Sequence, residues 1–137
     1  MVASTSARPL PPIVKRCGLV DYGSAWQAMK QFTASRTSDT PDEIWLLQHP
    51  PVYTLGLAGK PEHLLDAAEI PVVASDRGGQ VTYHGPGQIV AYLLLDMRRW
   101  KLSVRELVQL MEQAVVNLLA DYGVTASGSV QAPGVYI

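Results

Sequence analysis

The amino-acid sequence predicts one α+β domain with a mixed sheet flanked by helices. Its 137 residues, 47% of them hydrophobic and 17% charged, have the size and balance of one globular domain, which excludes an intrinsically disordered chain. Two segments show helical periodicity, and several short apolar runs bounded by turn residues have the character of strands. The order helix, strands, helix, strands favours α+β over a strict βαβ series.

The N-terminal part of the sequence predicts an arm followed by a helix. Residues 1–12 combine small polar residues with prolines, so we expect a flexible arm there and the domain over residues 13–137. Between Tyr22 and Arg36, large apolar residues recur at spacings of three, which places Trp26, Met29 and Phe32 on one stripe. This segment is therefore predicted to be an amphipathic helix.

Three short segments in the middle of the chain predict further elements. The run Ile44–Leu47 predicts a strand that ends in a loop, because Pro50 and Pro51 cannot sit inside a paired central strand. One or two helical turns are expected within Lys60–Ala68, and residues 71–75 (PVVAS) predict a short β-branched strand.

The C-terminal third predicts the longest helix, from Ser103 to Gly123. Ser103 and Glu106 match the capping box, and Gly123 stands where a left-handed stop is expected. The apolar positions follow a 3.6-residue period and are Val104, Leu107, Val108, Met111, Val115, Leu118, Leu119 and Tyr122. We expect this face to pack on a sheet, to which Val135–Ile137 would add a strand.

Charge and composition exclude several classes of function. Eleven basic and twelve acidic residues give a net charge of −1, which provides no global basic field for nucleic acid or an anionic membrane. The longest apolar run, Ile89–Leu95, predicts a strand and is far shorter than the roughly 20 residues of a membrane span. Cys17 is the one cysteine, so no internal disulfide forms. A soluble, cytoplasmic protein is expected.

The residues that carry chemistry are concentrated between Asp76 and Gln88. Gly78 and Gly79 allow a ligand to approach the backbone, and their N–H groups can form a nest for a carbonyl oxygen or an anion. Arg77 adds a positive charge. In an extended chain Gln80, Thr82 and His84 share one face, and Val81 and Tyr83 share the other. This polar face is predicted to line a pocket.

The following residues, Gly85-Pro86-Gly87-Gln88, favour a type II turn and hence a hairpin. The alternative is that these glycines serve turn geometry alone and that no pocket exists. A nucleotide-binding loop is disfavoured, because the segment lacks the Lys and Ser/Thr of a phosphate-binding loop and the glycine spacing of a dinucleotide fingerprint.

The three histidines and the cysteine are candidate ligands or nucleophiles by residue type. The separations of 14 and 21 residues between His49, His63 and His84 do not suggest a metal site, and none is predicted. His49 is expected in a loop and His63 on the surface, while His84 is either a pocket residue or a turn histidine. Basic neighbours make Cys17 a candidate thiolate, but a small buried hydrophobic residue is the favoured interpretation.

A basic cluster lies at the start of the predicted long helix and consists of Arg98, Arg99, Lys101 and Arg105. Positive charge at a helix N-terminus opposes the helix dipole by about a few tenths of a kcal/mol, so helix stability does not explain the cluster. An acidic partner would explain it, and a plain solvated face is the alternative.

The segment RGGQVTYHGPGQIVAYLLLDM, with LLQHPPVYTLG before it and SVREL and APGVYI after it, resembles the bacterial octanoyltransferase family of lipoate biosynthesis. The resemblance runs from about Cys17 to Ile137. It implies the fold of biotin and lipoate protein ligases, a cytoplasmic location and no cofactor. It also implies transfer of an octanoyl group from octanoyl acyl carrier protein to a lysine in the lipoyl domains of target enzymes.

In that family the acyl-substrate-binding segment corresponds to Arg77, Gly78, Gly79, Gln80, Val81, Thr82, Tyr83 and His84. The family's cysteine, which carries the acyl group as a thioester, and its activating lysine correspond to positions beyond Ile137. No catalytic residue is therefore assigned within this chain, and the 137-residue chain alone is expected to be inactive. The alternatives are an ATP-dependent lipoate or biotin ligase and a noncatalytic acyl-binding or partner-binding fragment.

Overall fold

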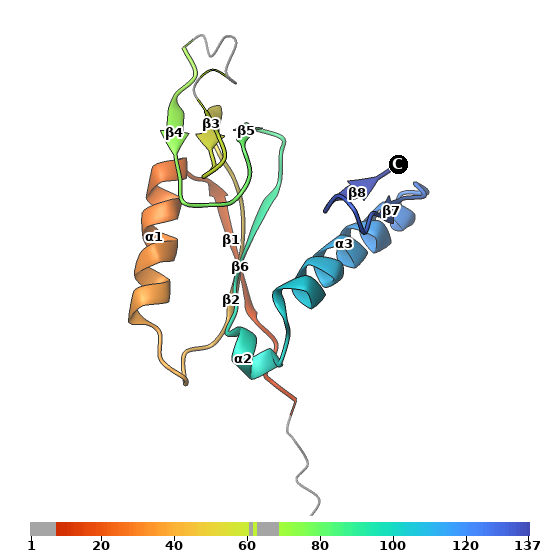
Figure 1. Ribbon diagram of the computed structural model, residues 1–137. Helices are drawn as coiled ribbons and strands as arrows, with labels where there is room; N and C mark the ends of the chain where they lie inside the picture. The colour runs from red at the N-terminus through yellow and green to blue at the C-terminus, as the bar shows by residue number, and fades with distance from the viewer. Residues whose placement is uncertain (1–7, 61, 63–68) are drawn as a thin grey trace, which may run out of the picture. The chain divides into compact units, whose positions relative to one another are not determined.

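A computed structural model describes residues 8–60, 62 and 69–137 (Figure 1). The chain divides into two compact units, Met1–Leu95 and Asp96–Ile137, which are described separately. The helical turns expected within Lys60–Ala68 and the position of His63 lie outside the described residues, as do the first seven residues of the expected arm.

The first unit contains a three-stranded sheet and a helix that covers one of its faces. The strand order is β1 (Ile13–Leu19), β2 (Glu43–Gln48) and β6 (Val90–Leu94), with β1 parallel and β6 antiparallel to β2. Helix α1 (Tyr22–Ser35) connects β1 to β2 and lies along the sheet (Figure 1). The predicted helix and the predicted strands of β2 and β6 are confirmed to within about two residues.

A second three-stranded sheet follows in the same unit. Its order is β4 (Val72–Ala74), β3 (Val52–Leu55) and β5 (Val81–His84), with β4 parallel and β5 antiparallel to β3. Both sheets are mixed, which confirms the α+β prediction. The strand expected at residues 71–75 is confirmed as β4.

The predicted hairpin is wrong, although its turn is confirmed. The N–H of Gln88 donates to the Gly85 carbonyl at 3.1 Å, and Gly87 has φ of 92°, as a type II turn requires. However, β5 pairs with β3 while β6 pairs with β2, so the flanking strands belong to different sheets. The turn therefore redirects one long strand instead of reversing it.

The partner strand bends at the facing position: the loop predicted after β2 is present at residues 49–51, but the sequence analysis missed that a strand resumes at Val52. Pairing stops after Leu47 opposite Val90 and resumes with Val52 opposite His84. Two prolines explain the interruption, because they donate no N–H to a ladder. The strand then continues as β3, the central strand of the second sheet. We call residues 49–51 the proline bend and residues 85–89 the glycine bend.

Strand β1 was also not predicted. All seven of its residues are exposed, and its sequence does not alternate between polar and apolar residues. Its pairing with β2 is irregular at Cys17, where the register shifts between Arg16 and Gly18. Periodicity alone therefore could not identify this strand.

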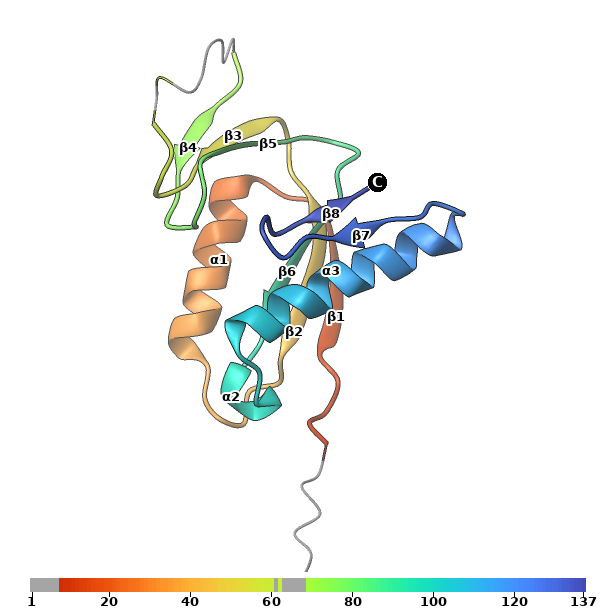
Figure 2. The ribbon, with the colours of Figure 1, turned by 45° about the vertical axis from the view of Figure 1, so that its right-hand side comes forward.

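The second unit consists of two helices and a small antiparallel sheet (Figure 2). Helix α2 (Met97–Trp100) precedes α3 (Val104–Asp121), and β7 (Ser127–Gly128) pairs with β8 (Val135–Tyr136). Within this unit α3 contacts that two-stranded sheet, and the strand expected near Val135 is confirmed.

Both predicted ends of α3 are confirmed. Ser103 and Glu106 form the reciprocal capping box. At the other end, Gly123 has φ of 75°, and the N–H groups of Gly123 and Val124 donate to the carbonyls of Ala120 and Leu119, each at 2.9 Å. This is a Schellman motif. Among the described residues, no helix is long and apolar enough to cross a membrane.

Candidate functional site

The proline bend holds a completely buried histidine. His49 has no exposed surface, and its Nδ1 lies 2.7 Å from the Val20 carbonyl oxygen. Because a carbonyl oxygen only accepts, Nδ1 carries the proton and Nε2 accepts from the Tyr92 hydroxyl at 2.8 Å. Burial lowers the pKa of His49, with the nearby His84 adding to that effect. The ring is thus held neutral with both nitrogens occupied.

Tyr92 on β6 completes this hydrogen-bonded chain. Burial, aided by the nearby Tyr22, raises the pKa of Tyr92 to about 12. The phenol therefore keeps its proton at neutral pH and donates it to His49. The Tyr22 ring of α1 meets His49 edge-on at 5.2 Å. The cluster of Tyr22, His49 and Tyr92 therefore connects α1, the proline bend and β6.

His84 approaches the same cluster from the end of β5. Its ring stacks on Tyr22 with 6.3 Å between centroids and 12° between planes, and it meets His49 edge-on at 5.8 Å. Its Nδ1 lies 2.5 Å from Oε1 of Gln88 in the glycine bend. Unlike His49, His84 is half-buried and reaches the surface.

Tyr22 presents a second polar atom at this place. The residue is 7% exposed, yet its hydroxyl has no protein partner among the described residues. Among the described residues, the one buried side-chain polar atom that lacks a hydrogen-bond partner is Nε of Arg36. Because the Tyr22 hydroxyl also lacks a partner, it is not fully buried and is accessible to solvent. Tyr22 and His84 therefore each keep a polar atom without a protein partner in the described part of the chain, whereas the polar side-chain atoms of His49 and Tyr92 are hydrogen-bonded.

The glycine-rich loop before β5 is held together by Arg77. Its guanidinium donates to the Thr54 hydroxyl and carbonyl at 2.8 Å each, to the Gly78 carbonyl at 2.7 Å and to the Gln80 carbonyl at 2.9 Å. Thr54 is fully buried on the central strand β3. The positive charge expected at this loop is thus held in a fixed position, where Arg77 braces the loop by bonding its backbone carbonyls and Thr54.

A second loop, after β3, closes against this one. The N–H of Gly56 donates to the Gln80 carbonyl at 2.7 Å, and the N–H of Ala58 donates to the Gly79 carbonyl at 3.0 Å. A Cβ on Gly56 would lie 2.3 Å from the Gly79 carbonyl oxygen, so no other residue fits there. The sequence analysis overlooked Gly56, because only the facing loop reveals its role.

The two loop glycines keep their N–H groups available. The carbonyls of Gly78 and Gly79 are used internally, whereas their N–H groups have no protein partner in the described part of the chain. Gly79 has φ of 86°, and a Cβ on Gly78 would meet nothing within 4 Å. Open space beside unpaired donors is what the predicted nest requires.

The rest of the predicted segment lies on β5 or beside it. Gln80, Thr82 and Tyr83 are exposed, and Val81 is half-buried. The Tyr83 ring lies 5.4 Å from that of Tyr53 across the strand pair. The segment therefore offers both polar groups and an aromatic surface.

His49 is the residue of this cluster that the sequence analysis undervalued. It lies outside a strand, as predicted, but it is buried at the centre of the cluster. A signal was available, since the strand period of two places His49 on the same face as the buried Leu47. The flanking prolines concealed that period.

Cys17 is exposed, so the favoured interpretation of a buried hydrophobic residue is wrong. It lines a hollow of about 370 Å³ together with Ala25, Ala28 and Leu47, between α1 and the first sheet. Its Sγ donates weakly to the Lys15 carbonyl at 3.8 Å.

The comparisons with known proteins agree on one family. Residues 21–137 match the lipoyl protein ligase A/B catalytic domain. The octanoyltransferase of Nitrosospira multiformis is 70% identical over 124 residues, covering 90% of this chain and 58% of that protein. The octanoyltransferase of Azoarcus sp. is 67% identical over 133 residues, covering 96% of this chain and 59% of that protein. The chain thus spans somewhat more than half the length of these relatives.

Solved structures support the fold. A T. acidophilum protein with bound lipoic acid matches with a TM-score of 0.70 at 15% identity, over 93% of this chain and 55% of that one. Lipoate-protein ligase A bound with ATP matches with a TM-score of 0.65 at 15% identity, over 93% and 54% of the two chains. The fold, the glycine-rich loop and the sequence match together show that the chain belongs to the lipoyl protein ligase A/B catalytic domain family.

Proposed function

We propose that this chain forms the acyl-binding part of an octanoyltransferase of lipoate biosynthesis. The observation that carries the proposal is the 57–70% identity to octanoyltransferases over at least 90% of the chain. In this proposal the octanoyl group comes from octanoyl acyl carrier protein and passes to a lysine in the lipoyl domain of a target enzyme, in the cytoplasm.

The glycine-rich loop suits the carbonyl end of the octanoyl thioester. The N–H groups of Gly78 and Gly79 are unpaired donors beside open space, and Arg77 holds their loop in shape. Donors fixed in this way stabilise negative charge on a carbonyl oxygen without rearranging. Arg77 therefore contributes to the site through the loop rather than by contacting the acyl group.

The alkyl chain needs apolar surface, and the strand pair β3–β5 supplies it. Tyr83 is 45% exposed and lies beside Tyr53. Each methylene group transferred from water contributes about 0.8 kcal/mol. In this proposal the binding segment remains the one expected from the sequence, Arg77 to His84, with Gln80, Val81 and Thr82 between the loop and the cluster.

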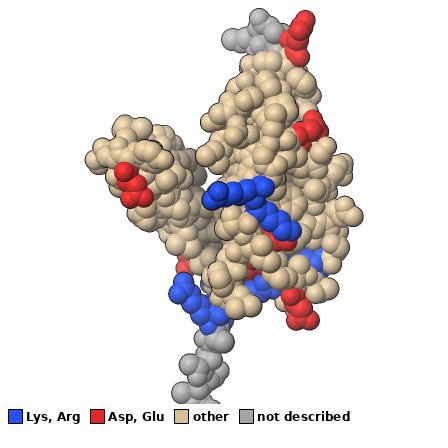
Figure 3. Space-filling view, turned by 180° about the vertical axis from the view of Figure 1, so that it is seen from behind, with Lys and Arg blue, Asp and Glu red and all other residues tan. Residues whose placement is uncertain are grey.

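The basic cluster supports an acidic carrier protein as the source of the octanoyl group. The Arg98 side chain is 94% exposed, although it also pairs with Asp96 at 3.5 Å. On the face drawn in Figure 3, basic and acidic side chains are interspersed among uncharged surface, so a docking signal has to be local. Arg99, Lys101 and Arg105 provide such a local concentration of positive charge.

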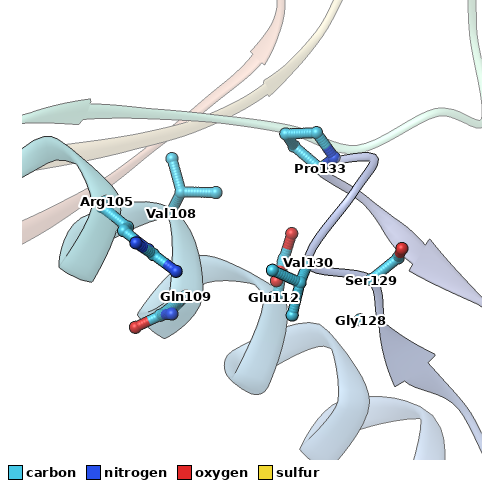
Figure 4. A pocket seen from close by; sticks show the side chains of 8 residues that line it. All are labelled: Arg105, Val108, Gln109, Glu112, Gly128, Ser129, Val130 and Pro133. Atoms are coloured by element: carbon cyan, nitrogen blue, oxygen red, sulfur yellow. The ribbon is translucent and has the colours of Figure 1, made fainter.

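Arg105 also lines a concavity of about 290 Å³ in the second unit (Figure 4). Helix α3 contributes Val108, Gln109 and Glu112, and the loop between β7 and β8 contributes Ser129, Val130 and Pro133. The N–H of Gly134 donates to Glu112 at 2.9 Å, which ties this loop to the helix. Arg105 thus places a positive charge beside a hollow whose loop is hydrogen-bonded to α3, and an acidic partner could bind there.

The test is octanoyl transfer by the intact protein, with octanoyl acyl carrier protein and a lipoyl domain as substrates. Gly78→Ala is the informative variant, because its methyl group has room in the free protein but would occupy the space beside the donors. We expect kcat/KM to fall about tenfold with unchanged thermal stability. Transfer that requires ATP and free octanoic acid would instead assign the chain to the ligases. Unchanged kinetics for Gly78→Ala would show that the acyl group does not bind at this loop.

A further inference from the structure

Helix α1 contacts both ends of the segment that the proposed function assigns to acyl binding. Tyr22 and Trp26 are separated by about one helical turn, so both side chains lie on the same face of the helix. Tyr22 stacks on His84, the last residue of that segment. Trp26 donates its indole N–H to the carboxylate of Asp76 at 3.1 Å, and Asp76 directly precedes Arg77, the first residue of the segment. One face of one helix therefore meets the segment at both of its ends.

The hydrogen bond between Trp26 and Asp76 differs from the other bonds of the glycine-rich loop. The Arg77 guanidinium and the loop carbonyls bond to β3 and to the loop that follows it, so they hold the glycine-rich loop on the second sheet. In the described part of the chain, the bond from Trp26 is the one hydrogen bond between residues 75–80 and α1, which covers the first sheet. It therefore connects the two sheets apart from the proline bend and the glycine bend.

The Trp26 ring is held in place for this contact. It is half-buried, and the ammonium of Lys30, one further turn along α1, lies over the ring at 4.1 Å from its centroid. A cation over the face of an indole ring is attracted to it, which limits the rotation of the side chain. Asp76, in contrast, is exposed, so its carboxylate fills no space in the interior. Its bond to Trp26 therefore acts on the position of the loop more than on the packing of the core.

We propose that Trp26 is a positioning residue for octanoyl binding, and that it acts through Asp76 by holding the glycine-rich loop in the orientation that binds the thioester. The inference rests on the proposed octanoyl transfer and assigns no bond-making step to either residue. Gly78 and Gly79 follow Asp76 closely in the chain, so a movement of Asp76 is carried to their N–H donors. A ligand that binds one loop orientation loses affinity in proportion to the fraction of molecules that leave it.

The first test establishes the hydrogen bond in solution. The indole N–H groups of Trp26, Trp45 and Trp100 give separate nitrogen–proton NMR signals in the intact protein. We expect Asp76→Ala to move the Trp26 signal and to leave the Trp45 signal in place, because the Trp45 indole donates to Glu43 instead. A Trp26 signal that does not respond to Asp76→Ala would overturn the proposal.

The second test measures the affinity of the intact protein for the amide analogue of octanoyl-pantetheine, in which N–H replaces the thioester sulfur, so that no transfer accompanies binding. We expect Kd to rise about fivefold in Trp26→Phe, which keeps a ring but loses the donor. Asp76→Ala should produce the same rise, and the double variant should add no further rise, because each change removes the same bond. Asp76→Asn keeps an oxygen acceptor and should restore most of the affinity.

Trp45→Phe is the matched control. It also removes an indole N–H from a carboxylate, since Nε1 of Trp45 lies 2.6 Å from Oε2 of Glu43, but both of these residues belong to β2 in the first sheet. We expect this variant to bind the analogue with the Kd of the wild type. An equal rise of Kd in Trp45→Phe and Trp26→Phe would reduce Trp26 to a structural residue.

The outcomes separate this inference from the proposed function. If the wild type binds the analogue and transfers the octanoyl group, an unchanged Kd in Trp26→Phe would contradict the positioning role and leave the function standing. Rises that multiply in the double variant would show that Trp26 and Asp76 act independently, which contradicts the role as well. A wild-type protein that neither binds the analogue nor transfers the octanoyl group would remove the proposed function and this inference together.

Discussion

The two bends that face each other across the long strand pair treat their histidines in opposite ways. In the proline bend, His49 is fully buried and both ring nitrogens are bonded. Next to the glycine bend, His84 is half-buried and is bonded at one nitrogen, Nδ1. The histidine beside one bend is therefore fully bonded, whereas the histidine beside the other has one ring nitrogen without a partner among the described residues.

This difference follows from the residues that make each bend. Prolines fix the backbone φ and remove N–H donors, so the proline bend leaves no N–H to be bonded at Pro50 and Pro51, and His49 beside them is the buried residue of the bend. Glycines permit the positive φ of Gly87 and keep the opposite bend thin and open. The buried ring of His49 meets the His84 ring edge-on at 5.8 Å, so it supports that ring without bonding either of its nitrogens.

Among the variants that test this difference between the bends, His49→Ala should lower the free energy of unfolding the most. It leaves a cavity and strands the Tyr92 hydroxyl and the Val20 carbonyl, so we expect a loss of about 2–4 kcal/mol in the free energy of unfolding. Chemical denaturation measures this. A loss below about 0.5 kcal/mol, the range of ordinary surface substitutions, would show that the proline bend does not stabilise the fold through His49.

A smaller loss is expected for Gly87→Ala. Its φ of 92° is unfavourable for any residue with a Cβ, although nothing lies within 4 Å of the added methyl group. The strain should cost about 1 kcal/mol of unfolding free energy in the same denaturation experiment. Unchanged stability would mean that the turn tolerates another conformation.

Lowering the pH should distinguish the two bends, because His49 is fully buried and His84 is half-buried. Its pKa is lowered in the folded state, so at mildly acidic pH the unfolded chain binds a proton that the folded chain does not. Stability should fall as the pH drops below about 6.5, the ordinary histidine pKa, until the lowered pKa is reached. Unfolding free energies measured from pH 7 downward should show a shallower slope in His49→Gln, and identical slopes would contradict the burial of a neutral ring.

The smallest effect on stability is expected for His84, next to the glycine bend. His84→Gln retains a polar side chain at a half-buried position and strands no sealed group, so the change should stay within about 0.5 kcal/mol. Thermal unfolding beside the activity assay provides the measurement. A loss as large as that of His49→Ala would mean that both histidines are structural.

The sequence predicted the parts of the fold whose signals are local. The helix periodicity of α1, the capping box of α3 and the turn at Gly87 depend on neighbouring residues, and each is confirmed. The segment Arg77 to His84 was singled out in the same way, from residue types and spacing.

Signals that depend on distant partners were missed. The continuation of β2 into β3 becomes visible only when the glycine bend lies opposite the prolines. The bonds from Arg77 to Thr54 could not be predicted, because the two residues are 23 positions apart in sequence. The same separation hides Gly56, whose need for glycine comes from a loop more than twenty residues later.

The central claim, that the open side of this corner binds the acyl group, is tested most directly by titrating the intact protein with octanoyl-pantetheine while recording amide and imidazole NMR signals. We predict the largest shifts at the N–H groups of Gly78 and Gly79 and at Nε2 of His84, with the ring signals of His49 keeping their Nδ1–H pattern. Shifts confined to the hollow lined by Arg105, or none at the glycine-rich loop, would contradict the account.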